Sequence, residues 1–270
     1  MSGAPGLAIA REWQRFTPGE RLARFVVYLG VVAAIVASIQ TVEVIPEFIA
    51  DAPEQIGDML RRMWPIAWGF YPEGVQAPLL ESLHIATLGT VAAVLMAVPV
   101  AFLAARNVTP HAGLNYFAKL ILVSARSVNT LIWALFFVAV FGPGALAGTM
   151  AIAFHSIGFT GKLLSEALEE SNRGTIEALQ ATGAPWLSVA IKGYWPQVKP
   201  AFWAIVLFRW DINVRESAVL GLVGAGGVGM ALDTALNLFQ WDRVAMILVA
   251  ILGVVIAAEI VVTGIRRRIL

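Results

Sequence analysis

Four charged residues lie close together in a chain that is otherwise rich in apolar residues. The segment FRWDINVRES, residues 208–217, carries Arg209, Asp211, Arg215 and Glu216 directly after the apolar run AFWAIVLF. On membrane-insertion scales each charge at the bilayer centre costs about 2.5–3.5 kcal/mol, so four charges facing lipid would cost on the order of 10 kcal/mol. We therefore expect these side chains to face protein or water.

Helical spacing divides these polar residues into two stripes. At about 100° per residue, Arg209, Asn213 and Glu216 share one face of a helix. Asp211 and Arg215 lie on roughly the opposite face, at the i,i+4 spacing of an ion pair. Because that pair can satisfy itself, we expect it to be structural and the first stripe to line a substrate path. A structural role for both stripes remains open, since buried ion pairs in helical bundles often only pack.

Two further ionisable residues lie within apolar segments elsewhere in the chain. Arg126 and His155 both fall at interior depths of expected membrane spans. Ionisable residues within membrane segments tend to face a cavity and to mark functional sites. We predict that both contact the substrate path, although a lone histidine is more often a satisfied residue of the bundle.

A glycine-rich segment, GAGGVG at residues 224–229, formally matches a dinucleotide-binding fingerprint. Its glycines are Gly224, Gly226, Gly227 and Gly229. The fingerprint requires a preceding strand and an acidic residue about 20 positions further on, whereas this segment follows an apolar span. Irregular backbone is tolerated at membrane depth only where protein or a watery cavity covers it. We predict a loop beside the path rather than a nucleotide site.

The sequence indicates neither a nucleotide site nor a metal site. SIGFTGKL, residues 156–163, resembles half of a P-loop but has Ser156 and Leu163 where the motif requires glycine and serine or threonine. The chain has no cysteine, and its three histidines, at positions 84, 111 and 155, lack metal-ligand spacing. We therefore expect no catalytic residue, no metal and no cofactor in this chain.

Composition indicates a membrane protein that crosses the bilayer several times. Hydrophobic residues make up 59% of the 270-residue chain and charged residues 14%, with a mean hydropathy of +0.76. Soluble domains average about 45–50% apolar and about 25% charged residues. The net charge of +1 does not point to a nucleic-acid partner. In lipid the backbone must satisfy itself, so the predicted class is all-α, a polytopic transmembrane helical bundle.

Six apolar stretches are near the roughly 20 residues that a spanning helix needs. They are residues 25–42, 83–105, 120–141, 145–165, 200–222 and 244–265. The predicted organisation is an N-terminal cytoplasmic segment 1–24, a first span 25–42, an external loop 43–82 and a core domain 83–270. The first span is longer than the apolar region of a typical signal peptide, so we expect it to be retained.

Basic residues at both ends of the chain predict the orientation. Arg11, Arg15, Arg21 and Arg24 precede the first span, and Arg266, Arg267 and Arg268 follow the last. Cytoplasmic flanks carry an excess of such residues, so both termini are expected inside. In the external loop, Pro53 is expected to begin an amphipathic surface helix, which either packs on the bundle or docks an external partner.

The longest expected cytoplasmic loop, residues 166–199, has the pattern of two short helices joined by a turn. Thr175 can cap the first helix, and Gly183 can end it. Pro185 can open the second helix, and Pro196 is expected to close it.

This loop resembles the coupling loop of binding-protein-dependent ABC importer permeases. That family has Glu-Ala-Ala, a glycine four residues later and a proline thirteen after the glycine, positions that Glu177, Ala178, Gly183 and Pro196 occupy here. The resemblance implies that these residues dock onto an ATPase subunit. Leu179, Gly193 and Trp195 depart from the usual residues, and an ordinary helix–turn–helix loop remains the alternative.

Other segments resemble the phosphonate importer permeases, and the similarity runs from about residue 50 to the end. They are GTVAAVLMAVPVAFLAARNVTP (89–110), HSIGFTGKLLSEALEE (155–170), FRWDINVRES and LGLVGAGGVG (220–229). Permeases for phosphite and phosphate share these motifs, so the choice among the three substrates stays open. The family commonly has Pro-Glu near positions 129–130, where this chain has Asn129 and Thr130. An acidic residue with a gating role there would therefore be missing.

The resemblance implies a type I ABC importer permease fold and a set of partners. We expect a homodimer in a bacterial cytoplasmic membrane, with the path at its interface. Two ATPase subunits would carry ATP and magnesium, and an extracytoplasmic binding protein would deliver phosphonate or a related oxyanion. An ion-gradient-driven transporter would favour inverted repeats, which we do not see. A membrane enzyme would need a nucleophile–base set, which is also not evident.

Overall fold

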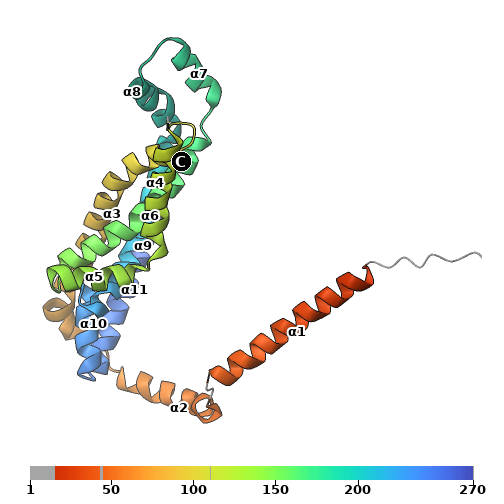
Figure 1. The fold of residues 1–270 in the computed structure, drawn as a ribbon. Helices are drawn as coiled ribbons and strands as arrows, with labels where there is room; N and C mark the ends of the chain where they lie inside the picture. Colours follow the sequence, from red (N-terminus) through yellow and green to blue (C-terminus); the bar gives the residue numbers. More distant parts are fainter. Residues whose placement is uncertain (1–15, 43–44, 110, 270) are drawn as a thin grey trace, which may run out of the picture. The chain divides into compact units, whose positions relative to one another are not determined.

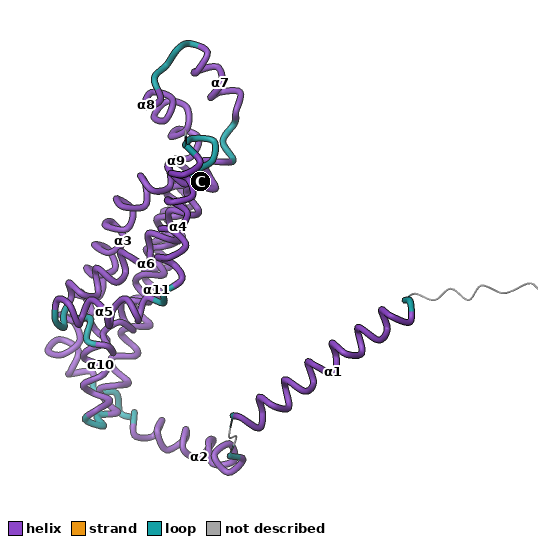
Figure 2. Tube along the Cα trace, in the orientation of Figure 1, coloured by secondary structure: helices purple, strands orange, loops and turns teal. Residues whose placement is uncertain are grey.

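A computed structural model describes residues 16–42, 45–109 and 111–269, which are largely helical and contain no strand (Figures 1 and 2). The chain divides into two units, Met1–Asp58 and Met59–Leu270. Most of the predicted cytoplasmic segment 1–24, with Arg11 and Arg15, lies outside the described residues.

The first unit begins with helix α1, Pro18–Thr41, which contains most of the predicted first span. The hydroxyl of Thr17 caps the helix by accepting from the Glu20 amide, and the Glu20 carboxylate accepts from the Thr17 amide at 2.9 Å. This reciprocal pair satisfies two of the free amides at the start of a helix. At 24 residues, α1 is long and apolar enough to cross a membrane.

Helix α2, Pro46–Arg62, begins seven residues earlier than predicted. Pro46 takes the early-helix position expected for Pro53, which instead lies inside the helix, where it removes one backbone hydrogen bond. Glu47 in the first turn and Arg61 and Arg62 in the last turn complement the helix dipole. The prediction that Pro53 begins this helix was therefore wrong, although an amphipathic sequence does form a helix here.

The second unit is a helical bundle. Its α-helices are α3 Gln76–Ala104, α4 Ala112–Ser127, α5 Thr130–Phe141, α6 Ala145–Glu169, α7 Arg173–Ala181, α8 Trp186–Val189, α9 Trp195–Leu220, α10 Val228–Asn237 and α11 Trp241–Ile269. Short 3-10 turns cover Trp68–Phe70 and Gly221–Val223, and π-helical turns cover Tyr71–Val75 and Ala190–Tyr194. Helices α7 and α8 lie at one end of this bundle (Figure 1).

Helix α6 lies at the centre of the bundle, against α3, α4, α5 and α9. Small residues bring its neighbours close. A Cβ added to Gly89 of α3 would lie 2.7 Å from the Ile152 side chain, and one added to Gly158 of α6 would lie 2.5 Å from the Leu122 carbonyl oxygen. Membrane helices pack through such small residues because lipid provides no hydrophobic drive for association.

The predicted third span, residues 120–141, is not one continuous helix. Helix α4 ends at Ser127, α5 begins at Thr130, and the two are bent by 90°. Val128 is extended, and the Asn129 side chain accepts a hydrogen bond from the Leu131 amide at 2.9 Å. Asn129 therefore caps a new helix instead of continuing the old one, because its side chain satisfies a free amide at the helix start.

The helix that contains the predicted fifth span, 200–222, begins before residue 200. Helical backbone runs from Trp186 through Val223 and is followed, after a bend of 42°, by α10. By length and composition, the described residues contain three helices able to cross a membrane, or up to five if each bent pair is one span. Helix α6 is not among them, although it has 25 residues. Six spans, with α6 as one of them, stays a prediction.

Candidate functional site

Arg209 of α9 lies inside the bundle and is partnered there. Its side chain is 4% exposed, its Nε donates to Ser156 Oγ at 2.8 Å, and its Nη2 lies 3.2 Å from Glu216 Oε2. The Phe159 ring centroid is 5.6 Å from the guanidinium carbon. A buried guanidinium requires this kind of compensation, because desolvating a charge is costly.

The other two residues of the stripe extend this network, so that it joins α9 to three other helices. Asn213, which is fully buried, donates from Nδ2 to Thr90 Oγ1 of α3 at 2.8 Å and accepts from Ser156 Oγ of α6 at 3.2 Å. Glu216 accepts from Thr130 Oγ1 of α5 at 2.9 Å. Arg209, Asn213 and Glu216 thus tie α9 to α3, α5 and α6. Sequence reasoning did not find their partners, because a serine or threonine on an apolar helix is too common to be a signal.

The second stripe has one buried and one exposed member. Arg215 forms an ion pair with Asp211, but the Arg215 side chain is 49% exposed and that of Asp211 only 11%. Arg215 borders an open pocket of about 320 Å³. The residues that line it are Asn129, Thr130, Leu131, His155, Arg215, Glu216, Val219 and Leu220. The structure therefore brings His155, Arg215 and Glu216 together at one surface.

His155 is held in this pocket by the break between α4 and α5. Its Nδ1 lies 3.0 Å from the carbonyl oxygen of Val128, which the bend leaves outside a helix. Because a carbonyl oxygen only accepts, Nδ1 is the donor in this contact, and Nε2 of the neutral ring is then an acceptor. Toward an anion, the pocket thus offers the half-exposed Arg215 as its donor, while the neutral imidazole and the Glu216 carboxylate beside it are acceptors.

Arg126, the remaining candidate for the path, lies in a different cavity. It is exposed on α4 and borders an open cavity of about 280 Å³ between α4 and α6, toward the α7 end of the bundle. The structure therefore places His155 and Arg126, which the sequence treated alike, in two different cavities, the first lined by α5, α6 and α9 and the second mainly by α4 and α6.

The glycine-rich loop is packed into the bundle. Gly227 has φ +75°, and a Cβ there would lie 2.3 Å from Ser82 Oγ, which accepts from the Val228 amide at 2.8 Å. Gly226 has φ +85° and would clash with the backbone of Ala145. These are backbone positions that only glycine occupies without strain. The structure explains the glycines by packing, and a role beside the path stays a prediction.

The coupling-loop residues lie on an exposed turn. Glu177 and Ala178 are exposed on α7, and Gly183 has φ +74° after the helix end. Two details of the prediction were wrong. Asn172 caps α7, accepting from the Gly174 amide at 2.9 Å, so Thr175 lies inside the helix. Pro196 falls at the start of α9 in continuous helical backbone, so it does not end the second helix.

Two departures from the family pattern in this loop pack near each other. A Cβ added to Gly193 would lie 3.1 Å from Leu179 Cδ1 and 2.8 Å from Ile176 Cδ1. A larger residue at position 179 therefore needs a smaller one at position 193. Tyr194 donates from its hydroxyl to the Asn107 carbonyl at 3.0 Å and anchors the loop on the bundle.

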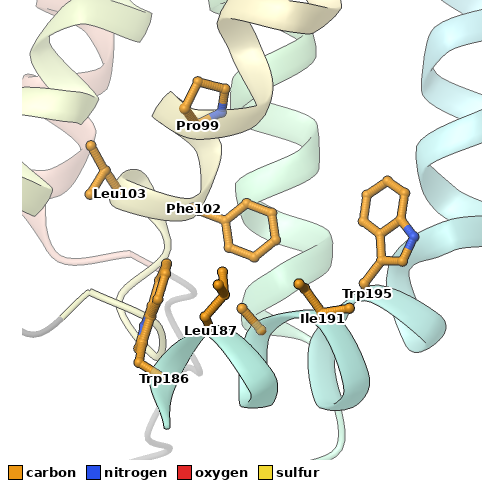
Figure 3. Close-up of a pocket in the computed structure, with 8 residues that line it drawn as sticks. Pro99, Phe102, Leu103, Trp186, Leu187, Ile191 and Trp195 are labelled. Carbon is orange, nitrogen blue, oxygen red and sulfur yellow. The ribbon is translucent and has the colours of Figure 1, made fainter.

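A third hollow, of about 450 Å³, lies between the end of α3 and the α8 region (Figure 3). It is lined by Pro99, Phe102, Leu103, Trp186, Leu187, Ala190, Ile191 and Trp195. This lining has no charged side chain, so it does not suit an oxyanion.

Two thirds of the chain match a known protein family. Residues 89–270 match the family described as "Binding-protein-dependent transport system inner membrane component". The chain belongs to this family. It is a multi-pass membrane protein, and the relatives that it matches are permease subunits rather than enzymes.

Two relatives of this chain are named for phosphorus oxyanions. The chain is 40% identical over 191 residues to phosphite transport system permease protein PtxC of Stutzerimonas stutzeri, and the match covers 71% of this chain and 69% of that protein. It is 37% identical over 234 residues to phosphate-import permease protein PhnE of Mycolicibacterium smegmatis, covering 87% of this chain. The matched region is only 44% of that relative, so the chain spans less than half of its length.

The fold also resembles solved transporters. A chain of the MetNI methionine ABC transporter, in inward-facing conformations, superposes with a TM-score of 0.63 and 21% identity, covering 73% of this chain and 96% of that one. A chain of a bacterial ABC transporter that imports alginate has a TM-score of 0.58 and 15% identity, covering 92% and 99%. At these identities the likeness shows the fold alone, which is that of a type I ABC importer permease.

Proposed function

We propose that this chain is the membrane-spanning subunit of an ABC importer for a phosphorus oxyanion, namely phosphonate, phosphite or phosphate. The main support is its identity of 37–40% to permeases named for phosphate and phosphite. The family match supports a transport role, and the pocket around Arg215 supports an anionic cargo.

The structure favours a different assignment of the two stripes from the one expected. Arg209 and Asn213 are buried and hydrogen-bonded within the chain, so they serve as the lock between α9 and its neighbours. Arg215 and His155 border an open pocket at membrane depth and form the contact with the path. A planar guanidinium can donate two hydrogen bonds to a tetrahedral oxyanion, which suits this cargo.

The exposed turn of α7 supports the proposed partners. Glu177, Ala178 and Gly183 are presented to solvent at one end of the bundle. In this proposal they dock onto one ATPase subunit, and a second copy of the chain docks onto another. The ATPases hold ATP and magnesium, an extracytoplasmic binding protein delivers the cargo, and both termini are cytoplasmic. Closure of the ATPases then moves the α7 turns and switches the path between its two openings.

Reconstitution tests this function directly. The permease is co-purified with its ATPase, placed in liposomes and supplied with the binding protein. We expect ATP-dependent uptake of at least one of phosphonate, phosphite and phosphate, and no uptake when the ATPase is omitted. Uphill uptake by the permease alone, driven by a proton or sodium gradient, would instead favour a secondary transporter.

A further inference from the structure

The cavity that contains Arg126 is rich in charged side chains. Four basic residues line it, Arg106, Lys119, Arg126 and Lys162, together with the acidic residues Glu166 and Glu169. Cations therefore outnumber carboxylates by two. Leu122, Val123 and Ser165 complete the lining. Such a wall attracts and concentrates anions.

No contact of the Arg126 side chain within the described residues gives this residue a structural role. Its side chain is exposed, and no hydrogen bond or ion pair of that side chain is found among the described residues. It lies beside Gly158, where an added Cβ would be 2.9 Å from the Arg126 Cβ. Gly158 precedes the last residue of α6, Glu169, by 11 positions, or roughly 16 Å. An exposed guanidinium without a protein partner can donate to an anion in the cavity.

The two lysines of the cavity are held only loosely. Lys119 Nζ lies 3.7 Å from Glu169 Oε1, and Lys162 Nζ lies 3.4 Å from Glu166 Oε1. The lysine side chains are 35% and 44% exposed. Partly exposed ion pairs of this kind contribute little to stability. Each lysine can therefore exchange its carboxylate for an incoming anion.

Helix α6 connects this cavity to the pocket around Arg215. His155 borders the pocket and Lys162 borders the cavity, seven residues further along the same helix. Seven residues are two helical turns, so both side chains share one face and are separated by roughly 10 Å along the axis. An anion leaving His155 and Arg215 would meet Arg126 and Lys162 next, in the direction of α7.

We propose that this cavity is a second oxyanion subsite, with Arg126 and Lys162 as its main ligands and Lys119 at its outer edge. It receives a tetrahedral phosphorus oxyanion from the pocket around Arg215 and releases it toward the α7 end of the bundle. This role rests on the proposed function. Two weak sites in series suit release, because each must bind the ion well enough to receive it and weakly enough to pass it on.

Binding of radiolabelled inorganic phosphate tests the subsite without transport. The permease–ATPase complex is placed in phosphatidylcholine nanodiscs, and no binding protein is added. We expect Arg126→Gln and Lys162→Gln each to weaken phosphate binding roughly tenfold, because each removes a charge-assisted hydrogen bond. Glu166→Gln should strengthen binding, because it frees Lys162. Lys199→Gln, at an exposed position of α9 outside the cavity, is the matched control and should change nothing.

The same experiment separates a free oxyanion from a lipid headgroup, which shares its chemistry. Adding phosphatidylglycerol to the nanodiscs should leave phosphate binding in place. The proposal is overturned if the wild-type complex binds no phosphate, if Arg126→Gln and Lys162→Gln bind it as well as the wild type, or if phosphatidylglycerol abolishes binding.

Uptake by the whole transporter distinguishes this proposal from the proposed function. Arg126→Gln should reduce ATP-driven uptake several-fold, while binding-protein affinity for the cargo stays the same. Normal uptake by Arg126→Gln would remove the subsite and leave the importer assignment intact. Absence of uptake of phosphate, phosphite and phosphonate by the wild-type transporter would remove the importer assignment itself.

Discussion

Arg209 and Arg215 lie six residues apart on α9, and the packing of that helix places them in opposite situations. The guanidinium of Arg209 is 4% exposed and donates to Ser156 and Glu216. That of Arg215 has one carboxylate partner, Asp211, and its side chain is 49% exposed beside an open pocket. Both are charges at membrane depth, where neither can face lipid.

The difference separates charges that hold the bundle together from charges that serve a ligand. Arg209 belongs to a network in which neighbouring helices supply the partners, so removing one member leaves another buried without compensation. Arg215 has guanidinium N–H donors that Asp211 does not use, and it borders the open pocket. Replacing the arginine at each of the two positions should therefore damage a different property.

The largest effect is expected for Arg209→Met. It leaves the Glu216 carboxylate with Thr130 as its remaining partner and removes the donor to Ser156. Breaking one side of a fully buried ion pair costs about 3–5 kcal/mol, and because Glu216 is 27% exposed we expect the lower end of that range. The nine tryptophans provide a fluorescence signal for thermal unfolding of the purified permease. We expect a large fall in the midpoint temperature of unfolding.

A second variant controls for the loss of the arginine side chain itself. Arg209→Met combined with Glu216→Gln removes both charges and should recover part of the stability. If Arg209→Met alone unfolded at the same midpoint temperature as the wild type, the network would not stabilise the packing of α9.

The next largest effect is expected at Gly227, in the packed glycine loop. Gly227→Ala adds a methyl group 2.3 Å from Ser82 Oγ at a residue with φ +75°. Left-handed strain and overpacking together should destabilise the fold by about 3 kcal/mol. Gly253→Ala is the matched control, because the space beside Gly253 on α11 is open. It should leave unfolding unchanged or stabilise it by up to about 1 kcal/mol.

Arg215→Gln should affect transport strongly and cost less stability than Arg209→Met. Arg215 itself is half exposed, but its partner Asp211 is only 11% exposed, so the variant leaves a nearly buried carboxylate whose replacement donor is the glutamine amide. Loss of a charge-assisted contact with the cargo should lower ATP-driven uptake roughly tenfold, which corresponds to about 1.4 kcal/mol. If Arg215→Gln unfolded at a much lower temperature than the wild type and still transported at the wild-type rate, Arg215 would serve stability and not transport.

Sequence periodicity was enough to sort the α9 charges into two stripes but not to decide which stripe is buried. The grouping depends only on the helical repeat, which is local. The burial of Arg209 depends on Ser156 and Thr90, which lie on other helices and become its neighbours, directly or through Asn213, only in the folded bundle. A pattern within one segment cannot report which helix packs on which face.

The break in the predicted third span was missed for a different reason. An apolar run across residues 120–141 satisfies a length criterion whether or not the helix bends. The signal was present in Asn129, a good N-cap residue in the middle of that run. The bend matters to the candidate site, because it releases the Val128 carbonyl that orients His155.

The smallest effect is expected for Gly183→Ala in the α7–α8 turn, and it isolates one cause of the Gly227 effect. Gly183 has φ +74° and Gly227 has φ +75°, so alanine meets nearly the same backbone strain at both positions. No atom lies within 4 Å of a Cβ added at Gly183, whereas Ser82 blocks the one at Gly227. Strain alone should then destabilise the turn by about 1 kcal/mol, measured by unfolding, and should reduce uptake less than Arg215→Gln does. An equal loss of stability at the two glycines would mean that the tight contact with Ser82 contributes nothing and that backbone conformation accounts for both.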